Sequence, residues 1–504
     1  MSDLPIRLEQ YNTFAEIVRA AAGLYGDRTF VVAGEARYSF REVDELVDQT
    51  AGYLMAAGVG ENDVVTIILG NSIEYLLLYF AASRIGAVIN PLPFHLSSAE
   101  IAEKLEFVGA RIVITEGKHY QELSTRTANL VEITGDFIDN VRARQHPSAI
   151  PRVKADTVGY LYYSSGTTGL PKLIEYTHRS ELVTMDSQLR SNFSQCLGPH
   201  LCFLPLGHTA AIRYSLLPCL IAGHPLVLYQ SFWKLRSRLW DEVALHQATY
   251  FQMVPSILNM MVNTKYPEYE REKVACLRYI GCGSSFLPVV LQQRCEERFG
   301  IRVANLYGLS ETGPTHFDDP LAEGWQPGSI GYPLDIMQVR LFGEAGDETP
   351  PGATGEIAVK GPSLLKGYYR AEELYQACFR DGFFMTGDLG RVDSDGRYYY
   401  VDRKKDLIIK GGINIAPGQI EAVLAELPGV AETAVVATPD PFLGENIKAF
   451  IVVAPDAEFD AEAARRHCLE KLGEFKTPSV FETIEELPKG PSGKILKRLL
   501  QERE

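Results

Sequence analysis

The sequence predicts an α/β protein, with a large N-terminal domain built on parallel sheets and a small α+β domain at its C-terminal end. The chain has 504 residues, about three times a typical domain, and its 46% hydrophobic and 22% charged residues are ordinary for a globular protein. Strand-like and helix-like patterns alternate through the first hundred residues, whereas short strands and turns follow residue 387. These observations favour two or more folded units over a single one.

The first of these expected helices begins at a capping box. Ser39 and Glu42 stand three residues apart, ahead of an amphipathic run that continues to Gly58. The elements expected next are a strand at 63–69, a helix at 73–86, a strand at 88–90, a helix at 97–110 and a strand at 111–115. Such alternation requires right-handed crossovers and a parallel sheet, whose ligands bind at the carboxyl ends of the strands.

The C-terminal part has its own set of elements. We expect a helix from Pro417, strands at 433–437 and 448–453, and a helix at 460–472. A turn cluster at 393–396 and a charged run at 403–406 precede them. We therefore predict an N-terminal domain of residues 1–402 and a C-terminal domain of residues 403–504.

The charge of the chain narrows the classes of partner. Its formal net charge is -15, which repels nucleic acid and anionic lipid. No apolar stretch approaches the roughly 18 residues that a membrane-spanning helix needs. The N-terminal sequence MSDLPIRLEQ is polar and has no secretory signal pattern. We expect a cytoplasmic protein with no nucleic-acid or membrane partner.

The segment from Tyr162 to Lys172 (YYSSGTTGLPK) has the composition of a phosphate-binding loop. Its serines, threonines and glycines supply hydroxyl donors and unhindered backbone N–H groups, and Lys172 adds a positive charge. The spacing differs from GxxxxGK[ST], which argues against a Walker-type kinase or ATPase. The segment predicts polyphosphate binding of another kind.

This loop and four later motifs resemble the adenylate-forming superfamily, which contains acyl-CoA synthetases, adenylation domains and luciferases. In order along the chain they are SSGTTGLPK, YGLSETG at 307–313, TGD at 386–388, the stretch from Asp395 to Gly412, and PKGPSGK at 488–494. Asp402 stands where the family usually has glycine. The resemblance is closest to acyl- or aryl-CoA ligases. It implies an N-terminal domain of several subdomains and a mobile C-terminal domain.

The resemblance also implies a two-step reaction. ATP, with Mg²⁺, would activate a carboxylic acid to acyl-AMP and release pyrophosphate, and the acyl group would then pass to the thiol of CoA. Since both steps build up negative charge on oxygen, cationic groups should carry much of the catalysis. The implied catalytic residues are Lys494, Lys172, Glu311 and His208, with Glu311 as the metal ligand.

The implied roles extend to ATP binding and to domain movement. Asp388 and Arg403 would hold the ribose, and Tyr307 would support adenine. Lys405 is the implied hinge, and Gly411 and Gly412 would line the thiol tunnel. The full set implied for ATP and AMP is Ser164, Ser165, Gly166, Thr167, Thr168, Gly169, Lys172, Gly283, Ser284, Tyr307, Gly308, Ser310, Glu311, Thr312, Asp388, Arg403 and Lys494.

The acyl group is predicted from apolar residues near the expected site. No acidic residue follows His208 in the stretch 209–218, which argues against an amino acid substrate. Arg213 would pair either a second substrate carboxylate or, the interpretation we favour, a surface partner. The expected pocket consists of His208, Ala211, Ile212, Phe251, Met253 and Cys282, and it suits an aryl, alicyclic or medium-chain acid.

Several alternatives stay open at this point. The same residues would serve an adenylation enzyme that loads the phosphopantetheine of a carrier protein. The negative net charge of the chain favours CoA over a carrier protein as the acceptor only mildly. Two further hypotheses are a luciferase-like oxidation and a catalytically inactive scaffold of the same fold. A homodimer is also left open.

Overall fold

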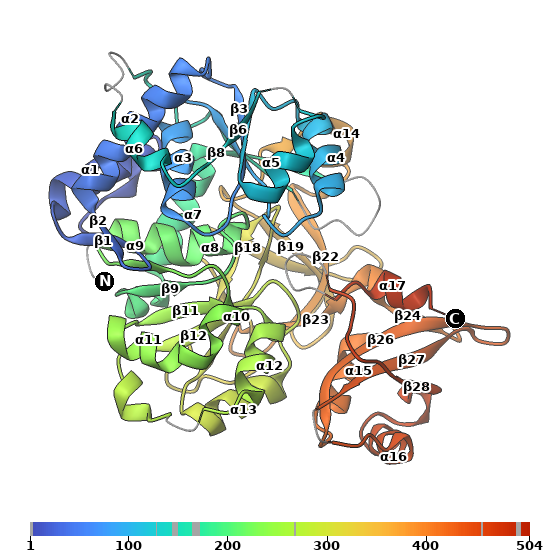
Figure 1. The fold of residues 1–504 in the computed structure, drawn as a ribbon. Helices are drawn as coiled ribbons and strands as arrows, with labels where there is room; N and C mark the ends of the chain where they lie inside the picture. Colours follow the sequence, from blue (N-terminus) through green and yellow to red (C-terminus); the bar gives the residue numbers. More distant parts are fainter. Residues whose placement is uncertain are drawn as a thin grey trace.

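The computed structural model confirms the predicted fold class: the protein is a mixed α/β molecule with a large N-terminal part and a smaller C-terminal part (Figure 1). It describes residues 4–127, 129–143, 150–163, 172–266, 269–454, 457–489 and 495–503. Among these residues, no helix combines the length and the apolar character needed to cross a bilayer.

One seven-stranded sheet of the N-terminal part contains the elements that the sequence predicts best. Its strand order is β20-β8-β7-β4-β3-β5-β6, and the strands from β7 to β6 in this order are parallel. The strands are β3 (Val64–Ile68), β4 (Val88–Pro91), β5 (Ile112–Thr115), β6 (Leu130–Glu132), β7 (Val158–Tyr163), β8 (Leu173–Thr177) and β20 (Gly367–Tyr368). β7 and β8 pair antiparallel, with Tyr163 opposite Leu173, so both ends of the predicted phosphate-binding segment are anchored in this sheet.

The helices around this sheet begin where the capping signals predict. The capping box predicted at Ser39 is present, and the helix expected from residue 97 begins at a second capping box, at Ser97. The helices of this region are α1 (Phe14–Tyr25), α2 (Phe40–Ala56), α3 (Ile73–Arg84), α4 (Ser98–Val108), α5 (Gly117–Leu123), α6 (Phe137–Arg142), α7 (His178–Arg190) and α14 (Glu372–Gln376). α3 is buried on all sides, because α1 and α2 cover it from outside the sheet.

A second seven-stranded sheet has the order β13-β12-β11-β9-β10-β1-β2 and is parallel except for β2. Its strands are β1 (Thr29–Ala33), β2 (Ala36–Ser39), β9 (His200–Cys202), β10 (Leu226–Leu228), β11 (Tyr250–Met253), β12 (Tyr279–Gly283) and β13 (Val303–Leu306). Its helices are α8 (Thr209–Ala211), α9 (Leu217–Ala222), α10 (Phe232–Leu235), α11 (Leu239–His246), α12 (Pro255–Asn263) and α13 (Val289–Phe299). The two large sheets share one hydrophobic core.

An antiparallel sheet, which the sequence patterns did not indicate, lies beside these layers. Its order is β18-β19-β22-β21, and β23 also pairs with β22. The strands are β18 (Gln338–Phe342), β19 (Gly355–Lys360), β21 (Phe379–Arg380), β22 (Phe383–Val392) and β23 (Tyr398–Arg403). Short two-stranded pairs precede it: β14 (Gly308–Leu309) with β15 (Gly313–Pro314), and β16 (His316–Phe317) with β17 (Tyr332–Pro333).

The C-terminal part has a separate five-stranded sheet and a separate core, built around Ile408, Ile420, Val435 and Ile447. The strands are β24 (Ile408–Lys410), β25 (Ile413–Ile415), β26 (Val430–Asp440), β27 (Gly444–Val453) and β28 (Val480–Thr483), and the helices are α15 (Pro417–Leu424), α16 (Ala461–Leu472) and α17 (Lys497–Gln501). Only the turn Lys404–Asp406 and Leu407 separate β23 from β24. The domain boundary that we predict between residues 402 and 403 therefore falls beside this turn.

Candidate active site

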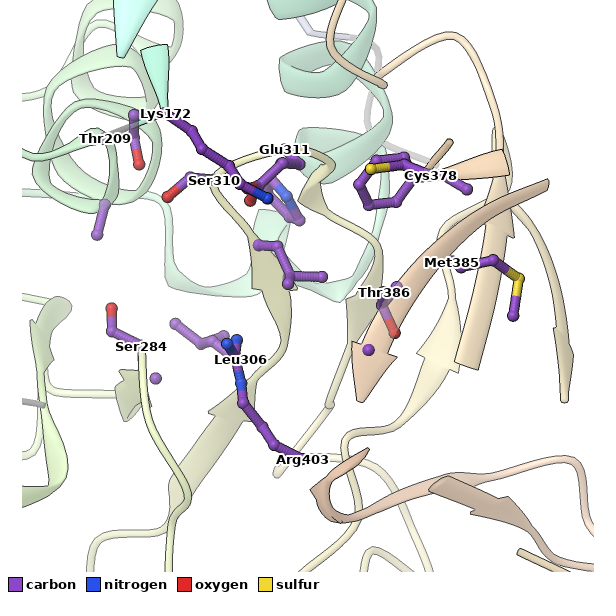
Figure 2. A pocket seen from close by; sticks show the side chains of 18 of the residues that line it. Lys172, Thr209, Ser284, Leu306, Ser310, Glu311, Cys378, Met385, Thr386 and Arg403 are labelled. Carbon is purple, nitrogen blue, oxygen red and sulfur yellow. The ribbon is translucent and has the colours of Figure 1, made fainter. Parts of the chain in front are cut away.

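A cavity of about 580 Å³ opens where the carboxyl ends of β11, β12 and β13 meet the antiparallel sheet. Gln252, Gly283 and Leu306 line it from the ends of these three strands, as expected for a parallel sheet. Figure 2 shows Lys172 extending into it from one side and Arg403 from the opposite side, with Thr209 and Ser284 along a third wall. A second cavity of about 790 Å³ shares Ser284, Leu306, Gly308, Arg403 and Lys405 with the first.

Lys172 and Glu311 form one end of the first cavity. The Tyr368 hydroxyl donates to Glu311 Oε1 at 3.2 Å, and Lys172 Nζ lies 5.3 Å from the centre of the Tyr368 ring. Burial raises the pKa of Glu311 above its usual value. A half-buried carboxylate beside a lysine is a suitable oxygen ligand for a hard cation that bridges phosphate oxygens. This end therefore fits a Mg²⁺–polyphosphate group.

Only some of the other residues expected at the phosphates belong to the described part of the chain. Ser310 and Gly308 line the cavity. Thr312 is fully buried and instead holds the loop together, since its Oγ1 accepts from the Leu309 N–H at 3.1 Å and donates to the Gly313 carbonyl at 2.8 Å. Ser164, Ser165, Gly166, Thr167, Thr168 and Gly169 lie outside the described residues.

Asp388, Arg403 and Tyr307 form a connected group on the border of the two cavities. Asp388 on β22 lies opposite Arg403 on β23, and Arg403 Nε is 3.0 Å from Asp388 Oδ1. The Tyr307 hydroxyl donates to Asp388 Oδ2 at 3.0 Å. Asp388 is only 3% exposed, so a bound polyol that reached it would meet a carboxylate already oriented by two partners.

Tyr307 itself is more enclosed than an open adenine platform. Its ring lies 5.4 Å from His316 and 6.3 Å from Tyr400, and it is 8% exposed. It lines the second cavity together with Phe286 and Tyr400. An aromatic ligand would thus enter from the second cavity.

His208 lines the first cavity together with its neighbours Thr209 and Ala210. Its Nδ1 accepts from the Ala210 N–H at 3.2 Å. Burial, with a contribution from the nearby Arg213 guanidinium, lowers the pKa of His208 to about 4. The imidazole is therefore neutral near pH 7.

Most of the residues expected to line an apolar acyl pocket lie elsewhere. Ala211, Ile212, Phe251, Met253 and Cys282 are each at most 1% exposed and pack in the core; neither cavity includes them. Side chains alternate along a strand, so on β11 it is Gln252, between Phe251 and Met253, that reaches the cavity. The pocket wall is consequently more polar than the sequence suggested.

The interpretation of Arg213 as a surface residue is wrong. Arg213 lines the cavity, is 3% exposed, and forms a two-pronged ion pair with buried Glu181 of α7. These two residues are 32 positions apart, and no local pattern connects them. Tyr368, Gln252 and Glu181 were likewise missed, because each is recognisable only from its neighbours in space.

The hinge and tunnel residues occupy different surroundings. Lys405 lines both cavities, and burial lowers its pKa. Gly411 and Gly412 form the exposed turn between β24 and β25, and both have positive φ, +54° and +80°. Neither glycine lines either cavity in this arrangement.

Lys494 lies outside the described residues, but the chain on either side of it is placed. Lys489 and Ile495 pair in an isolated β-bridge, and both line the second cavity. The ends of the segment that carries Lys494 therefore lie at the border between the C-terminal part and the rest of the molecule.

Comparison with known proteins places this geometry in context. A family model described as AMP-binding enzyme matches residues 18–369, and one described as AMP-binding enzyme C-terminal domain matches residues 419–494. The chain is 33% identical to a sulfoacetate–CoA ligase of Cupriavidus necator, over 97% of each chain. Among solved structures, ATP-bound MatB from Rhodopseudomonas palustris superposes with a TM-score of 0.89 at 26% identity, covering 97% of this chain and 98% of that one. The o-succinylbenzoate CoA synthetase of Bacillus subtilis, with its acyl-adenylate, gives a TM-score of 0.84 at 28% identity, covering 97% and 98%.

Proposed function

Because this chain belongs to the AMP-binding enzyme family and is an acid–thiol ligase, we propose that it converts a small carboxylic acid to an acyl-adenylate and then to a CoA thioester. The observation that carries the proposal is a cavity with Lys172 and Glu311 on one side and Arg403, which pairs with Asp388, on the opposite side (Figure 2). This spacing suits a nucleoside triphosphate with its acid partner between the two sides.

The first step is an in-line displacement at phosphorus. A carboxylate oxygen bonds to the α-phosphorus while the bond from that phosphorus to the bridging oxygen breaks, and pyrophosphate leaves with the electron pair. Lys172 neutralises charge on the departing phosphates, and Glu311 would hold Mg²⁺, which supplies Lewis-acid stabilisation when bound. The predicted donors at Ser164 to Gly169 and the predicted ammonium of Lys494 would complete this end.

Asp388 and Arg403 fix the nucleoside during that step. A ribose hydroxyl would donate to Asp388, as the Tyr307 hydroxyl does, and Arg403 would hold the carboxylate in place. Tyr307 supports the base from the second cavity.

In the second step the CoA sulfur bonds to the acyl carbon, AMP leaves with the electrons of the carbon–oxygen bond, and the thiol proton passes to solvent. Gly411 and Gly412 line neither cavity in this arrangement, so the thiol step would follow a rotation of residues 403–504 about Lys405. The boundary at residue 402 and the pivot are part of this proposal.

The acyl group that we propose differs from the one that the sequence predicted. A hydrophobic aryl, alicyclic or medium-chain acid was expected, yet Arg213, Gln252, Thr209 and Ser284 line the wall where it would bind. Sulfoacetate and o-succinylbenzoate, which appear in the names of two similar proteins, each carry a second acidic group.

ATP–pyrophosphate exchange, followed by mass spectrometry of CoA products, tests both steps. We expect acid-dependent exchange, formation of a thioester when CoA is added, and loss of both in Glu311→Gln. Exchange without a CoA product would indicate that the acyl acceptor in the second step is a carrier-protein phosphopantetheine instead of CoA. The inactive-scaffold alternative requires that no acid in a broad panel supports exchange.

A further inference from the structure

The wall of the first cavity contains a buried ion pair that the proposed reaction does not use. Arg213 Nε lies 3.0 Å from Glu181 Oε2, and Arg213 Nη2 lies 2.5 Å from Glu181 Oε1. The two side chains are 4% and 2% exposed. Taking two charges out of water is unfavourable, and a well-packed apolar pair is often at least as stable, so stability alone does not explain this pair.

Local structure holds the guanidinium in a single place. Arg213 lies in a π-helical turn, Ile212–Leu216, between α8 and α9, and its carbonyl accepts from Gln188 of α7 at 3.1 Å. The rings of Tyr176 and Tyr162 lie 4.9 Å and 5.7 Å from the guanidinium carbon. π-Helical turns are uncommon and are frequent at functional sites.

The ion pair with Glu181 leaves one guanidinium nitrogen, Nη1, beside Gly313. Glu181 occupies Nε and Nη2, whereas Nη1 lies 3.4 Å from the position that a Cβ on Gly313 would take. Arg213 and Gly313 both line the cavity, and Glu181 does not. The pair therefore presents its cationic side to the cavity and its anionic side to the core.

A second polar side chain belongs to the same wall. Gln252 is 3% exposed and lines the cavity. Its Oε1 is buried without a hydrogen-bond partner among the described residues, but that atom is an acceptor; the donor that this side chain offers to an acceptor oxygen is its amide N–H₂ group. Thr209, Tyr214 and Ser284 add hydroxyl groups to this wall.

We infer that Arg213 and Gln252 determine the substrate class: the acid carries a second, distal oxygen-bearing group that binds at this wall. The inference rests on the proposed function. Carboxylate, sulfonate and carbonyl oxygens share the needed chemistry, since each accepts hydrogen bonds from a guanidinium and an amide. Glu181 neutralises Arg213, so the wall attracts an anion as the positive end of a dipole and still accepts a neutral oxygen.

The test compares acids of equal chain length that differ only at the distal end. One arm has an ionised group, such as a dicarboxylic or sulfonated acid; the second has a neutral oxygen, such as the mono-methyl ester; the third is the plain alkyl acid. We expect both oxygen-bearing arms to exceed the alkyl arm by at least about tenfold in kcat/KM for pyrophosphate exchange. The better of the first two arms identifies the form of the group.

Two variants test the assignment to these residues. Arg213→Met combined with Glu181→Met removes both charges without leaving one unpaired, and Gln252→Leu removes no charge, so it serves even if the double variant is unstable. We expect each to reduce the preference for oxygen-bearing acids while the alkyl acid is still used. Arg190→Met is the matched control, because Arg190 lies on α7, pairs with Asp186 at 2.8 Å, and does not line the cavity.

The outcomes separate the two proposals. Exchange with alkyl acids as good as with their oxygen-bearing partners would overturn this inference and leave the proposed function standing. Absence of exchange with every acid would overturn the proposed function, and this inference with it. An unchanged preference in Gln252→Leu and in the double variant would exclude this wall as its source.

Discussion

Tyr368 links the two residues that we place at the polyphosphate. Its hydroxyl donates to Glu311 at 3.2 Å, while its ring lies under the Lys172 ammonium. A hydrogen bond to a half-buried carboxylate fixes the direction in which that carboxylate presents its second oxygen. Tyr368 is therefore a positioning residue that acts through Glu311.

Tyr368→Phe keeps the ring and removes the hydroxyl. We expect kcat/KM for ATP in pyrophosphate exchange to fall by about three- to tenfold, in line with roughly 0.5–1.5 kcal/mol for one hydrogen bond. Varying Mg²⁺ at fixed ATP should show a higher metal requirement. Tyr369→Phe, which removes a hydrogen bond to the Val108 carbonyl outside the cavity, is the control. Equal behaviour of the two variants would contradict the assignment.

The burial of His316 makes the stability of the folded protein depend on pH. It is 2% exposed, and burial lowers its pKa to about 3. As pH falls below the ordinary histidine value of about 6.5, the unfolded chain binds a proton that the folded chain does not, so stability decreases. The loss of stability that His316 causes reaches its full size only below pH 3.

His316→Phe should therefore flatten the loss of stability on acidification. The aromatic ring can still pack on Tyr307 and Tyr398, whose ring centres lie 5.4 Å and 4.9 Å away. Urea unfolding at pH 6.5 and pH 5 should show a drop smaller than that of the unchanged protein by up to about 2 kcal/mol. Parallel pH curves for the two proteins would contradict this account.

At the scale of elements, α15 depends on a residue from another sheet. Its own N-cap residue, Ala416, makes no side-chain cap, and Asp402 of β23 supplies one: Oδ2 accepts from the Gly418 N–H at 2.6 Å. Burial raises the pKa of Asp402 to about 6. The residue that departs from the family's usual glycine thus ties the antiparallel sheet to the first helix of the C-terminal part.

Asp402→Ala should remove that cap, at a cost of about 0.5–2 kcal/mol to α15. Hydrogen exchange of the Gly418 amide should accelerate accordingly. Adding Ala416→Ser restores a local cap and should slow the exchange again. If exchange at Gly418 is the same with and without Asp402, the carboxylate does not cap the helix.

At the scale of the whole molecule, two parts with separate cores meet at a short turn. Asn259 of α12 donates to the Ala431 carbonyl at 2.9 Å, and Arg294 of α13 donates to the Ala425 carbonyl at 3.0 Å. Both contacts are polar, as in interfaces that open. Figure 1 shows the C-terminal part beside the rest of the molecule, and Gly411 and Gly412 line neither cavity in this arrangement.

Lys405→Pro tests the proposed rotation. Proline restricts its own φ and the conformation of the residue before it, which opposes a change of backbone angles at this turn. We expect pyrophosphate exchange to persist and thioester formation to fall by more than about tenfold. Lys405→Ala keeps the backbone free and should retain both half-reactions. Full thioester formation by the proline variant would place the pivot elsewhere.

The sequence by itself determined the parallel α/β architecture, the capping box at Ser39, and two helices (α15 and α16) and two strands (β26 and β27) of the C-terminal part, since each depends on a period or a cap within a few neighbouring residues. The motifs around Lys172, Glu311 and Asp388 likewise led to residues that line the two adjoining cavities.

Only the tertiary structure decided the antiparallel sheet, the face of β11 that reaches the cavity, and the pairing of Arg213 with Glu181. Short apolar runs do not specify which of two strand faces is toward a ligand when both are buried, and an ion pair across 32 residues has no local signature. Whether an arginine is at the surface or in a pocket wall depends on what the rest of the chain packs around it.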